Sequence, residues 1–292
     1  MTPPGWKFLE RVRLVAPLGV RFWDRVTGAV VSEGLEVEVF PEGHPEQRVT
    51  VAANNSGVFN ARGLPGLAGF ETGGVANPTP RAFVIEVTDR AGRFLPFALP
   101  VDVPAGLLQW EPGVTMVPLF SAPSRPVPAG MAVVRAQLVR ADVPGPDPLD
   151  PEKRWPAPWA VLEVTPPGGP AVRGLADEGG SVVVVCPYPE PPPPPVDRPS
   201  PPPDPIRPGD RTWAVGVKAF FAPPASPLAA TTDRPDLRAL MTQPAARAWA
   251  DTALATELTA ATLLFGQEMV LRTTVPGTSP PESKPELFIT TP

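Results

Sequence analysis

The chain of 292 residues has room for two domains of ordinary size, each with its own hydrophobic core. Its 48 prolines forbid long helices and punctuate short strands, while 42% hydrophobic residues suffice for a packed interior, so the composition predicts an all-β protein. The net charge is only −5, and lysine and arginine are scattered singly. This distribution argues against nucleic-acid binding.

The N-terminal sequence MTPPGWKFLERVRLVAP is interrupted by charges at Lys7, Glu10 and Arg11, where a signal peptide needs an unbroken apolar core. The longest apolar runs, such as VVVVC at 182–186, have the length of a strand and fall short of the ~20 residues of a membrane span. We therefore expect a cytoplasmic protein without membrane insertion. Cys186 is the single cysteine, which excludes an internal disulfide, and its valine neighbours predict a buried strand end.

In the first 120 residues or so, alternating and apolar runs predict about seven short strands, the spacing of a β-sandwich. The clearest runs lie at 19–24, 35–40, 82–89, 93–101 and 114–120. Turns are expected at Thr27–Gly28, where Gly28 can adopt a positive φ, and at NNSG, residues 54–57. We expect the first sandwich at 1–122, followed by a linker at 123–130 within the sequence SAPSRPVPAG.

The remaining residues, 131–292, predict a second β-sandwich. Strands are expected at 131–143, at 211–221 and within 261–275, with further strands around a PPGG turn and a DEGG turn. One short helix is expected where Leu237, Leu240 and Met241 share a face before Pro244 ends the pattern.

A proline-rich segment interrupts this second sandwich, and 13 of the 22 residues from Pro187 to Pro208 are proline. It could be a tether between domains, a polyproline ligand for an aromatic groove, or a loop. The strands expected on both sides are too few to form separate domains. We therefore place 187–210 as a loop of the second sandwich, with contact to a neighbouring subunit as its expected role.

Catalytic motifs are missing from the sequence. The single histidine, His44, lies in the polar loop sequence PEGHPEQR. With one histidine and one cysteine, the usual zinc sites and the Cys–His and Ser–His catalytic pairs are almost excluded. No nucleophile elbow, P-loop or dinucleotide-binding glycine motif is present. We expect no enzymatic activity, no metal and no cofactor.

Two groups of acidic residues keep alternatives open. A calcium site is a minor alternative for the acidic loop at 142–152, and a hydrolase with paired carboxylates is a remote one for the DEGG turn. The acids of the loop are Asp142, Asp147, Asp150 and Glu152, and those of the turn are Asp177 and Glu178.

Seven tryptophans suggest binding surfaces, because exposed indoles serve protein interfaces and also stack on sugars. Trp23 and Trp213 lie in expected strands and are assigned to cores. The candidate interface residues are Trp6, Trp110, Trp155 and Trp159, together with Pro193 and Pro202 of the proline-rich segment.

The stretch VRFWDRVTGAVVSEGLEVEVFP, with Asp24, Thr27 and Gly28 at its turn, resembles the start of the carboxypeptidase regulatory-like (transthyretin-like) β-sandwich. SGVFNARGLPGL, RGLADEGGSVVVVCPYPEP and TLLFGQEMVLRT resemble bacterial proteins that carry such domains and are encoded beside phage-tail-like contractile injection systems. This resemblance implies a non-enzymatic structural or adaptor subunit at the cap, baseplate or anchoring surface of an injection particle. Its partners would be other subunits of the assembly, with homo-oligomerisation left open, and it would be assembled in the cytoplasm.

The main alternative is a carbohydrate- or surface-binding adhesion module that uses its tryptophans as stacking platforms. Co-purification with tail tube or sheath proteins would favour the first function, and tryptophan-dependent retention on polysaccharide the second.

Overall fold

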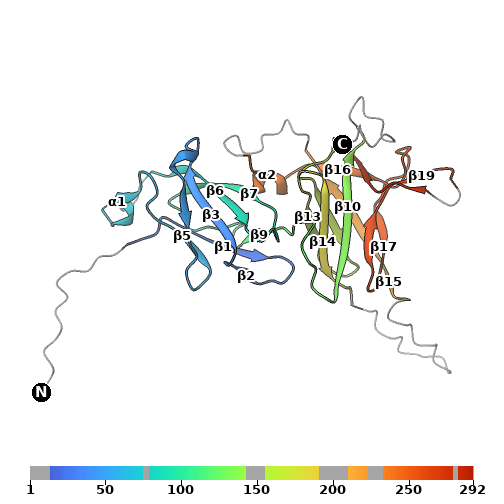
Figure 1. The fold of residues 1–292 in the computed structure, drawn as a ribbon, viewed down its shortest axis with the longest axis horizontal. Helices are drawn as coiled ribbons and strands as arrows, with labels where there is room; N and C mark the ends of the chain where they lie inside the picture. Colours follow the sequence, from blue (N-terminus) through green and yellow to red (C-terminus); the bar gives the residue numbers. More distant parts are fainter. Residues whose placement is uncertain are drawn as a thin grey trace, which may run out of the picture. The chain divides into compact units, whose positions relative to one another are not determined.

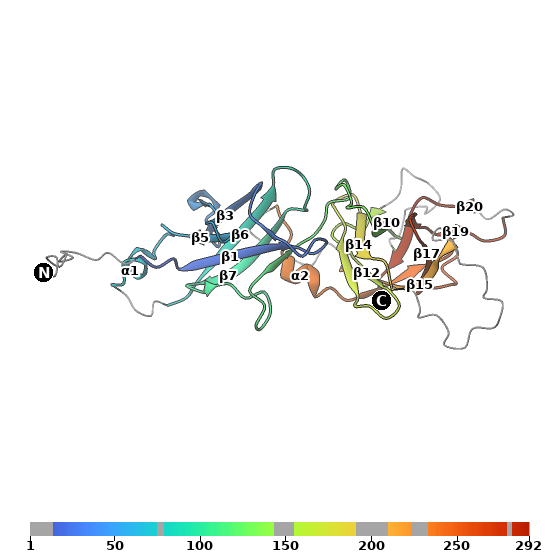
Figure 2. The same ribbon diagram turned by 90° about the horizontal axis from the view of Figure 1, so that it is seen from below.

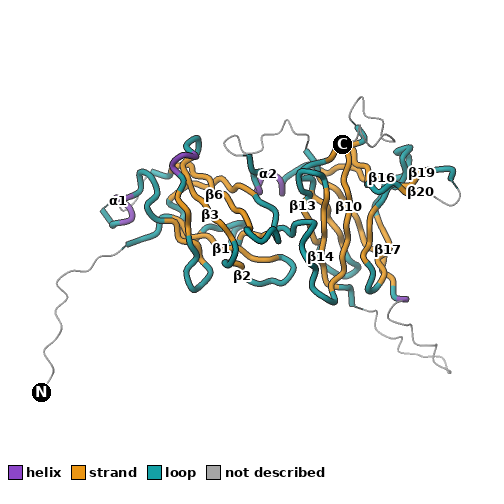
Figure 3. The backbone as a smooth tube through the Cα atoms, viewed as in Figure 1, coloured by secondary structure: helices purple, strands orange, loops and turns teal. Residues whose placement is uncertain are grey.

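The computed structural model describes residues 14–74, 79–142, 155–190, 210–222, 233–278 and 282–291. Strands dominate these residues, and helices are confined to short segments, which confirms the all-β fold predicted from proline content and alternation (Figures 1 and 3). The chain divides into two compact units. The first contains most residues up to Arg90 together with Pro96–Leu119, and the second contains Ala91–Leu95 and most residues from Phe120 onward. No helix among the described residues is long and apolar enough to cross a membrane.

Two sheets form the first unit, whose strands run from blue to green in Figures 1 and 2. In one sheet the central strand β1 pairs antiparallel with β2 and β5 and parallel with β8 and β9. Its strands are β1 (Leu18–Asp24), β2 (Val30–Val31), β5 (Val58–Ala61), β8 (Gly106–Leu107) and β9 (Val117–Leu119). The other sheet is antiparallel in the order β4-β3-β6-β7. Its strands are β3 (Leu35–Pro41), β4 (Val49–Val51), β6 (Arg81–Asp89) and β7 (Phe97–Val103), and the short helices of the unit are η1 (Pro45–Gln47) and α1 (Ala68–Glu71).

Phenylalanines fill the interior of this first unit. Phe22 of β1 is fully buried and meets Phe59 and Phe97 edge to face, with ring centroids 5.4 Å and 6.3 Å apart. Because Phe22 and Phe59 come from one sheet and Phe97 from the other, these rings join the two layers. Such contacts add to the free energy of burying the rings.

The two turns predicted in the first unit are confirmed. The Asp24 carboxylate accepts hydrogen bonds from the Val26 amide at 2.9 Å and the Thr27 hydroxyl at 2.7 Å, and Gly28 has a φ of 71°. In the NNSG turn, the Asn54 side chain accepts from two backbone amides downstream.

The second unit is organised around two long strands, β10 and β15. β10 pairs antiparallel with β14 and β11 and parallel with β18 and β21, whereas β15 pairs antiparallel with β12, β17 and β16. The pairing of β16 with β21 connects the two sets. The strands around β10 are β10 (Met131–Arg140), β11 (Trp155–Pro156), β14 (Ser181–Pro187), β18 (Glu268–Leu271) and β21 (Leu287–Thr290). Those around β15 are β12 (Val161–Thr165), β13 (Val172–Leu175), β15 (Thr212–Phe220), β16 (Ala245–Trp249) and β17 (Ala260–Leu264), and β19 (Thr274–Val275) pairs with β20 (Glu282–Ser283).

Small apolar residues fill the main core of this second unit. Alanine and valine make up most of its buried members, and Phe221 is the aromatic among those described. Cys186 is buried at the end of β14, as its valine neighbours predicted. The short helix α2 (Leu237–Met241) also forms as predicted: Asp236 caps its N-terminus, and Leu237 and Leu240 are buried.

Two expected strands are each divided by a local breaker. The run at 93–101 forms a strand only from Phe97, because Pro96 has no amide proton for the ladder, and Phe94 instead bridges Ser121. The run at 261–275 is not one strand: β17 ends at Leu264, and Gly266, with a φ of 74°, reverses the chain before β18. Most of the proline-rich segment, residues 191–209, lies outside the described residues.

Candidate binding surfaces

The residues that could have carried nucleophilic or metal chemistry, His44 and Cys186, belong to different units. His44 is exposed, with Nδ1 3.1 Å from Glu46 Oε1 in the same loop. Cys186 is buried in β14, and this burial raises the pKa of its thiol. Among the described residues, no three His, Cys, Asp or Glu side chains gather closely enough to hold a metal ion.

Of the acids that left calcium or hydrolysis open, Asp142 and Asp177 hold local structure, whereas Glu178 is exposed. Asp142 Oδ2 accepts a hydrogen bond from the Thr291 amide at 2.9 Å, which fastens the end of the chain to the strand β10 region. Asp177 Oδ1 accepts from the Ser181 amide at 2.9 Å and thereby closes the DEGG turn. The other three acids of the calcium alternative, Asp147, Asp150 and Glu152, lie outside the described residues.

The candidate interface tryptophans have very different surroundings. Trp155 is 54% exposed and Trp110 is half-buried, whereas Trp159 is only 7% exposed. The expectation that Trp159 lies at the surface is wrong: the residue lies in a turn, with a φ of 61°, and its side chain is buried in the second unit. The Trp159 carbonyl accepts a hydrogen bond from the Gln243 side chain, which joins this turn to the segment that follows α2. Trp6, Pro193 and Pro202 lie outside the described residues.

Backbone pairing fixes the position of the exposed Trp155. It is the first residue of β11, which pairs with the end of β10 so that Trp155 lies opposite Arg140 and Pro156 opposite Val139. An indole on an ordered strand loses little conformational entropy when a partner covers it. Trp155 is therefore the sequence-predicted interface residue whose geometry best suits a contact.

A second exposed aromatic surface was not predicted. Tyr188, Trp213 and Phe265 form an aromatic cluster in the second unit, with ring centroids 4.7 Å apart for Tyr188–Phe265 and 5.6 Å for Tyr188–Trp213. Tyr188 and Trp213 pack partly against the core, while Phe265 is 36% exposed. The Tyr188 hydroxyl accepts a hydrogen bond from the Gly266 amide at 2.9 Å, so the cluster is anchored to the turn between β17 and β18.

Three segments distant in sequence bring this cluster together. Tyr188 directly follows β14, Trp213 is the second residue of β15 and lies opposite Leu263 of β17, and Phe265 directly follows β17. Sequence patterning correctly placed Trp213 on a strand but had no signal for its neighbours. Aromatic residues at strand ends, beside a turn glycine such as Gly266, are the sequence feature that could have drawn attention to them.

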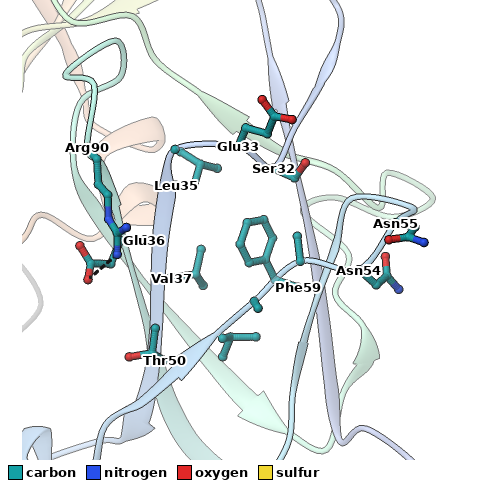
Figure 4. A pocket seen from close by; sticks show the side chains of 14 residues that line it. Ser32, Glu33, Leu35, Glu36, Val37, Thr50, Asn54, Asn55, Phe59 and Arg90 are labelled. Carbon is teal, nitrogen blue, oxygen red and sulfur yellow. Dashed lines mark hydrogen bonds and ion pairs between the residues drawn. The ribbon is translucent and has the colours of Figure 1, made fainter.

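A cleft of about 450 Å³ opens in the first unit, at the edge of the sandwich (Figure 4). Strand β3 forms one wall, β4 and the residues after it form another, and the ring of Phe59 lies between them. Leu35, Val37, Val51 and Phe59 make its interior apolar, while Ser32, Thr50 and Asn55 provide polar groups at its rim. The Arg90 guanidinium lies 3.5 Å from Glu36 Oε1 at the mouth, where both side chains are substantially exposed.

Comparisons with known proteins add no family. No protein-family model matches the chain, and no curated protein matches it. Among solved structures, a C-terminal fragment of the pilus adhesin SpaC from Lactobacillus rhamnosus GG aligns over 94% of this chain and 96% of the fragment, with 9% sequence identity and a TM-score of 0.18.

Proposed function

We propose that the chain is a non-enzymatic structural or adaptor subunit that binds other subunits of a large protein assembly. The observation that carries this proposal is Trp155, a large aromatic side chain that is 54% exposed and held on a paired strand. Tryptophan contributes more than most residues to binding free energy when a partner buries it. An ordered, exposed indole is therefore best explained as a contact residue.

The chemistry of the reactive side chains supports binding over catalysis. The Cys186 thiol is buried and its pKa is raised, so it is a poor nucleophile near neutral pH. Asp177, one of the two carboxylates of the hydrolase alternative, accepts the hydrogen bond that closes its turn. His44 is an exposed loop residue whose imidazole contacts the carboxylate of Glu46 in the same loop.

The assembly that we propose is a phage-tail-like contractile injection particle, in which the chain would act at the cap, the baseplate or the anchoring surface. The sequence resemblance of the Asp24–Gly28 turn and of the strands around Cys186 supports this identity, and the all-β fold is compatible with it. A tagged chain should co-purify with tail tube and sheath proteins when it is expressed with its neighbouring genes. Those genes should encode a tail tube, a sheath and an AAA ATPase, and their absence would overturn the proposed assembly.

Trp155→Ala tests the contact itself. This variant should retain its fold, because an exposed side chain contributes little to stability, but it should lose most tail tube and sheath protein from the purified complex. Val270→Ala is the matched control, since Val270 is also an exposed apolar residue of the second unit, at 39%. If both variants purify with undiminished partner, Trp155 is not the contact. If Trp155 is needed instead for retention on a polysaccharide column, the chain is a carbohydrate-binding module.

A further inference from the structure

The cleft of the first unit contains an unpaired length of strand edge. β3 pairs with β6 along its whole length, from Leu35 opposite Asp89 to Pro41 opposite Phe83. On its other side it pairs with β4 over only three residues, Val37 to Val39. Leu35 and Glu36 therefore have a strand neighbour on one side only.

The departure of the chain after β4 creates this gap. Ala53, which would lie opposite Leu35 if β4 continued, instead bridges Phe59 of the other sheet. The turn that follows is tight, because Asn54 Oδ1 accepts from the Ser56 amide at 2.9 Å and from the Val58 amide at 3.1 Å. The chain thus crosses from one sheet to the other, and the space beside Leu35 becomes the cleft (Figure 4).

The direction of the backbone groups at this edge follows from the ladder. Consecutive residues of an antiparallel strand direct their N–H and C=O groups to alternate sides. The Gly34 carbonyl accepts from the Arg90 amide at 2.9 Å, so Gly34 and Glu36 face β6. Leu35 consequently faces the cleft, and no strand in the described parts of the chain pairs with it from that side.

The lining of the cleft complements a peptide chain. A donor and an acceptor from one residue suit the backbone of an added strand, whereas Val37, Val51 and Phe59 suit an apolar side chain. The volume of about 450 Å³ lies within the range of ligand-binding clefts, roughly 300 to 1,000 Å³. The Glu36–Arg90 pair at the mouth can contact polar side chains of such a peptide.

We propose that this cleft binds an extended peptide segment of another protein, which adds a short strand beside Leu35 and inserts one apolar side chain toward Phe59. The inference deepens the proposed function, because it names a mode of protein contact. The cleft lies in the first unit and Trp155 in the second, so an experiment can refute one of the two proposals without refuting the other.

The test is selection of peptides from a phage-displayed heptapeptide library on the full chain, followed by fluorescence polarisation with the selected peptides. Leu35→Pro removes the outward amide at a position where an edge strand tolerates proline. Ala52→Trp places a bulky side chain at the cleft, since Ala52 is exposed and lines it. Each variant should weaken peptide binding about tenfold or more, the effect of losing roughly 1.4 kcal/mol of binding free energy.

Ala260→Trp is the matched control, because Ala260 is an exposed alanine at the start of β17 in the second unit. It should leave peptide binding unchanged. The selected sequences should alternate apolar and polar residues and lack proline at the centre. If Leu35→Pro fails to fold, Ala52→Trp still decides the result.

Three results would overturn the proposal. The first is that selection yields no peptide whose binding depends on Ala52, and the second is that peptides bind equally to wild type and to Leu35→Pro. The third is that an apolar dye such as anilinonaphthalene sulfonate binds the wild type but not Ala52→Trp, and that no selected peptide competes with the dye. This result would identify an apolar pocket that does not bind peptides.

Discussion

The two units solve the packing of a β-sandwich in opposite ways. The first joins two separate sheets through large rings such as Phe22, Phe59 and Phe97. The second connects its strands through β10 and β15, and alanine and valine make up most of the buried residues of its main core. A large buried ring leaves a cavity when it is truncated, whereas a core of small residues allows close backbone approach and leaves little room for added atoms. The first core should therefore be sensitive to lost volume and the second to added volume.

Phe22→Ala is expected to have the largest effect. Removing a fully buried ring that contacts both sheets should cost about 3 to 5 kcal/mol in the free energy of unfolding. Hydrogen exchange should show lost protection in β1, β5 and β7, while the strands of the second unit keep theirs. Leu107→Ala in the same unit is the control, because Leu107 is already 40% exposed. Equal loss of protection in both units would mean that their stabilities are not separable.

Gly174→Ala tests the opposite sensitivity. A Cβ at this position would lie 2.9 Å from Val184 Cγ2 and closer still to the Val183 carbonyl oxygen, so β13 or β14 would have to shift. We expect a cost of about 1 to 3 kcal/mol, measured by urea unfolding. At Gly216 the nearest heavy atom would be Thr165 Cβ at 3.5 Å, an ordinary contact. If Gly174→Ala is no more destabilising than Gly216→Ala, the close packing of the second unit does not limit its stability.

The turns allow a smaller comparison. Asp24 in the first unit is buried and accepts hydrogen bonds from the Val26 amide and the Thr27 hydroxyl. Asp177 in the second unit is partly exposed and accepts a hydrogen bond from the Ser181 amide. Asp24→Ala should cost about 1 to 2 kcal/mol, because it removes two hydrogen bonds that hold the turn, made by a carboxylate that is itself buried, and Asp177→Ala should cost less. Thermal unfolding of both variants decides the order, and a reversed order would contradict the comparison.

The smallest expected effect is at the end of the chain. Burial raises the pKa of Asp142, but hydrogen bonds from Thr291 and the charge of Arg140 outweigh it, so the pKa lies below its ordinary value of 3.8. The ionised carboxylate therefore stabilises the fold above the unfolded pKa, and this contribution disappears as the pH falls through the lower folded pKa. Asp142→Asn should cost less than about 1 kcal/mol at pH 7, because the pair is partly solvated. The difference from wild type should vanish in strong acid, and a difference that grows on acidification would refute this assignment.

Much of the fold can be predicted from local features of the sequence. Alternation predicted β3, β6 and β15, and Asp24 with Gly28 predicted a turn that forms as expected. The errors are equally local: Pro96 and Gly266 divide runs whose hydrophobicity is otherwise continuous. Trp159 was misplaced because exposure depends on what the chain packs against, and a tryptophan beside prolines fits either location.

Side-chain alternation and the φ preferences of single residues such as Gly28 are enough to predict the fold class, the longer strands and the two turns of the first unit. The pairing of the strands could not be predicted in this way, and it creates both the aromatic cluster of Tyr188, Trp213 and Phe265 and the cleft beside Leu35. Both sites arise from contacts between residues far apart in the chain. Such contacts are set by the packing of whole sheets, which no local pattern records.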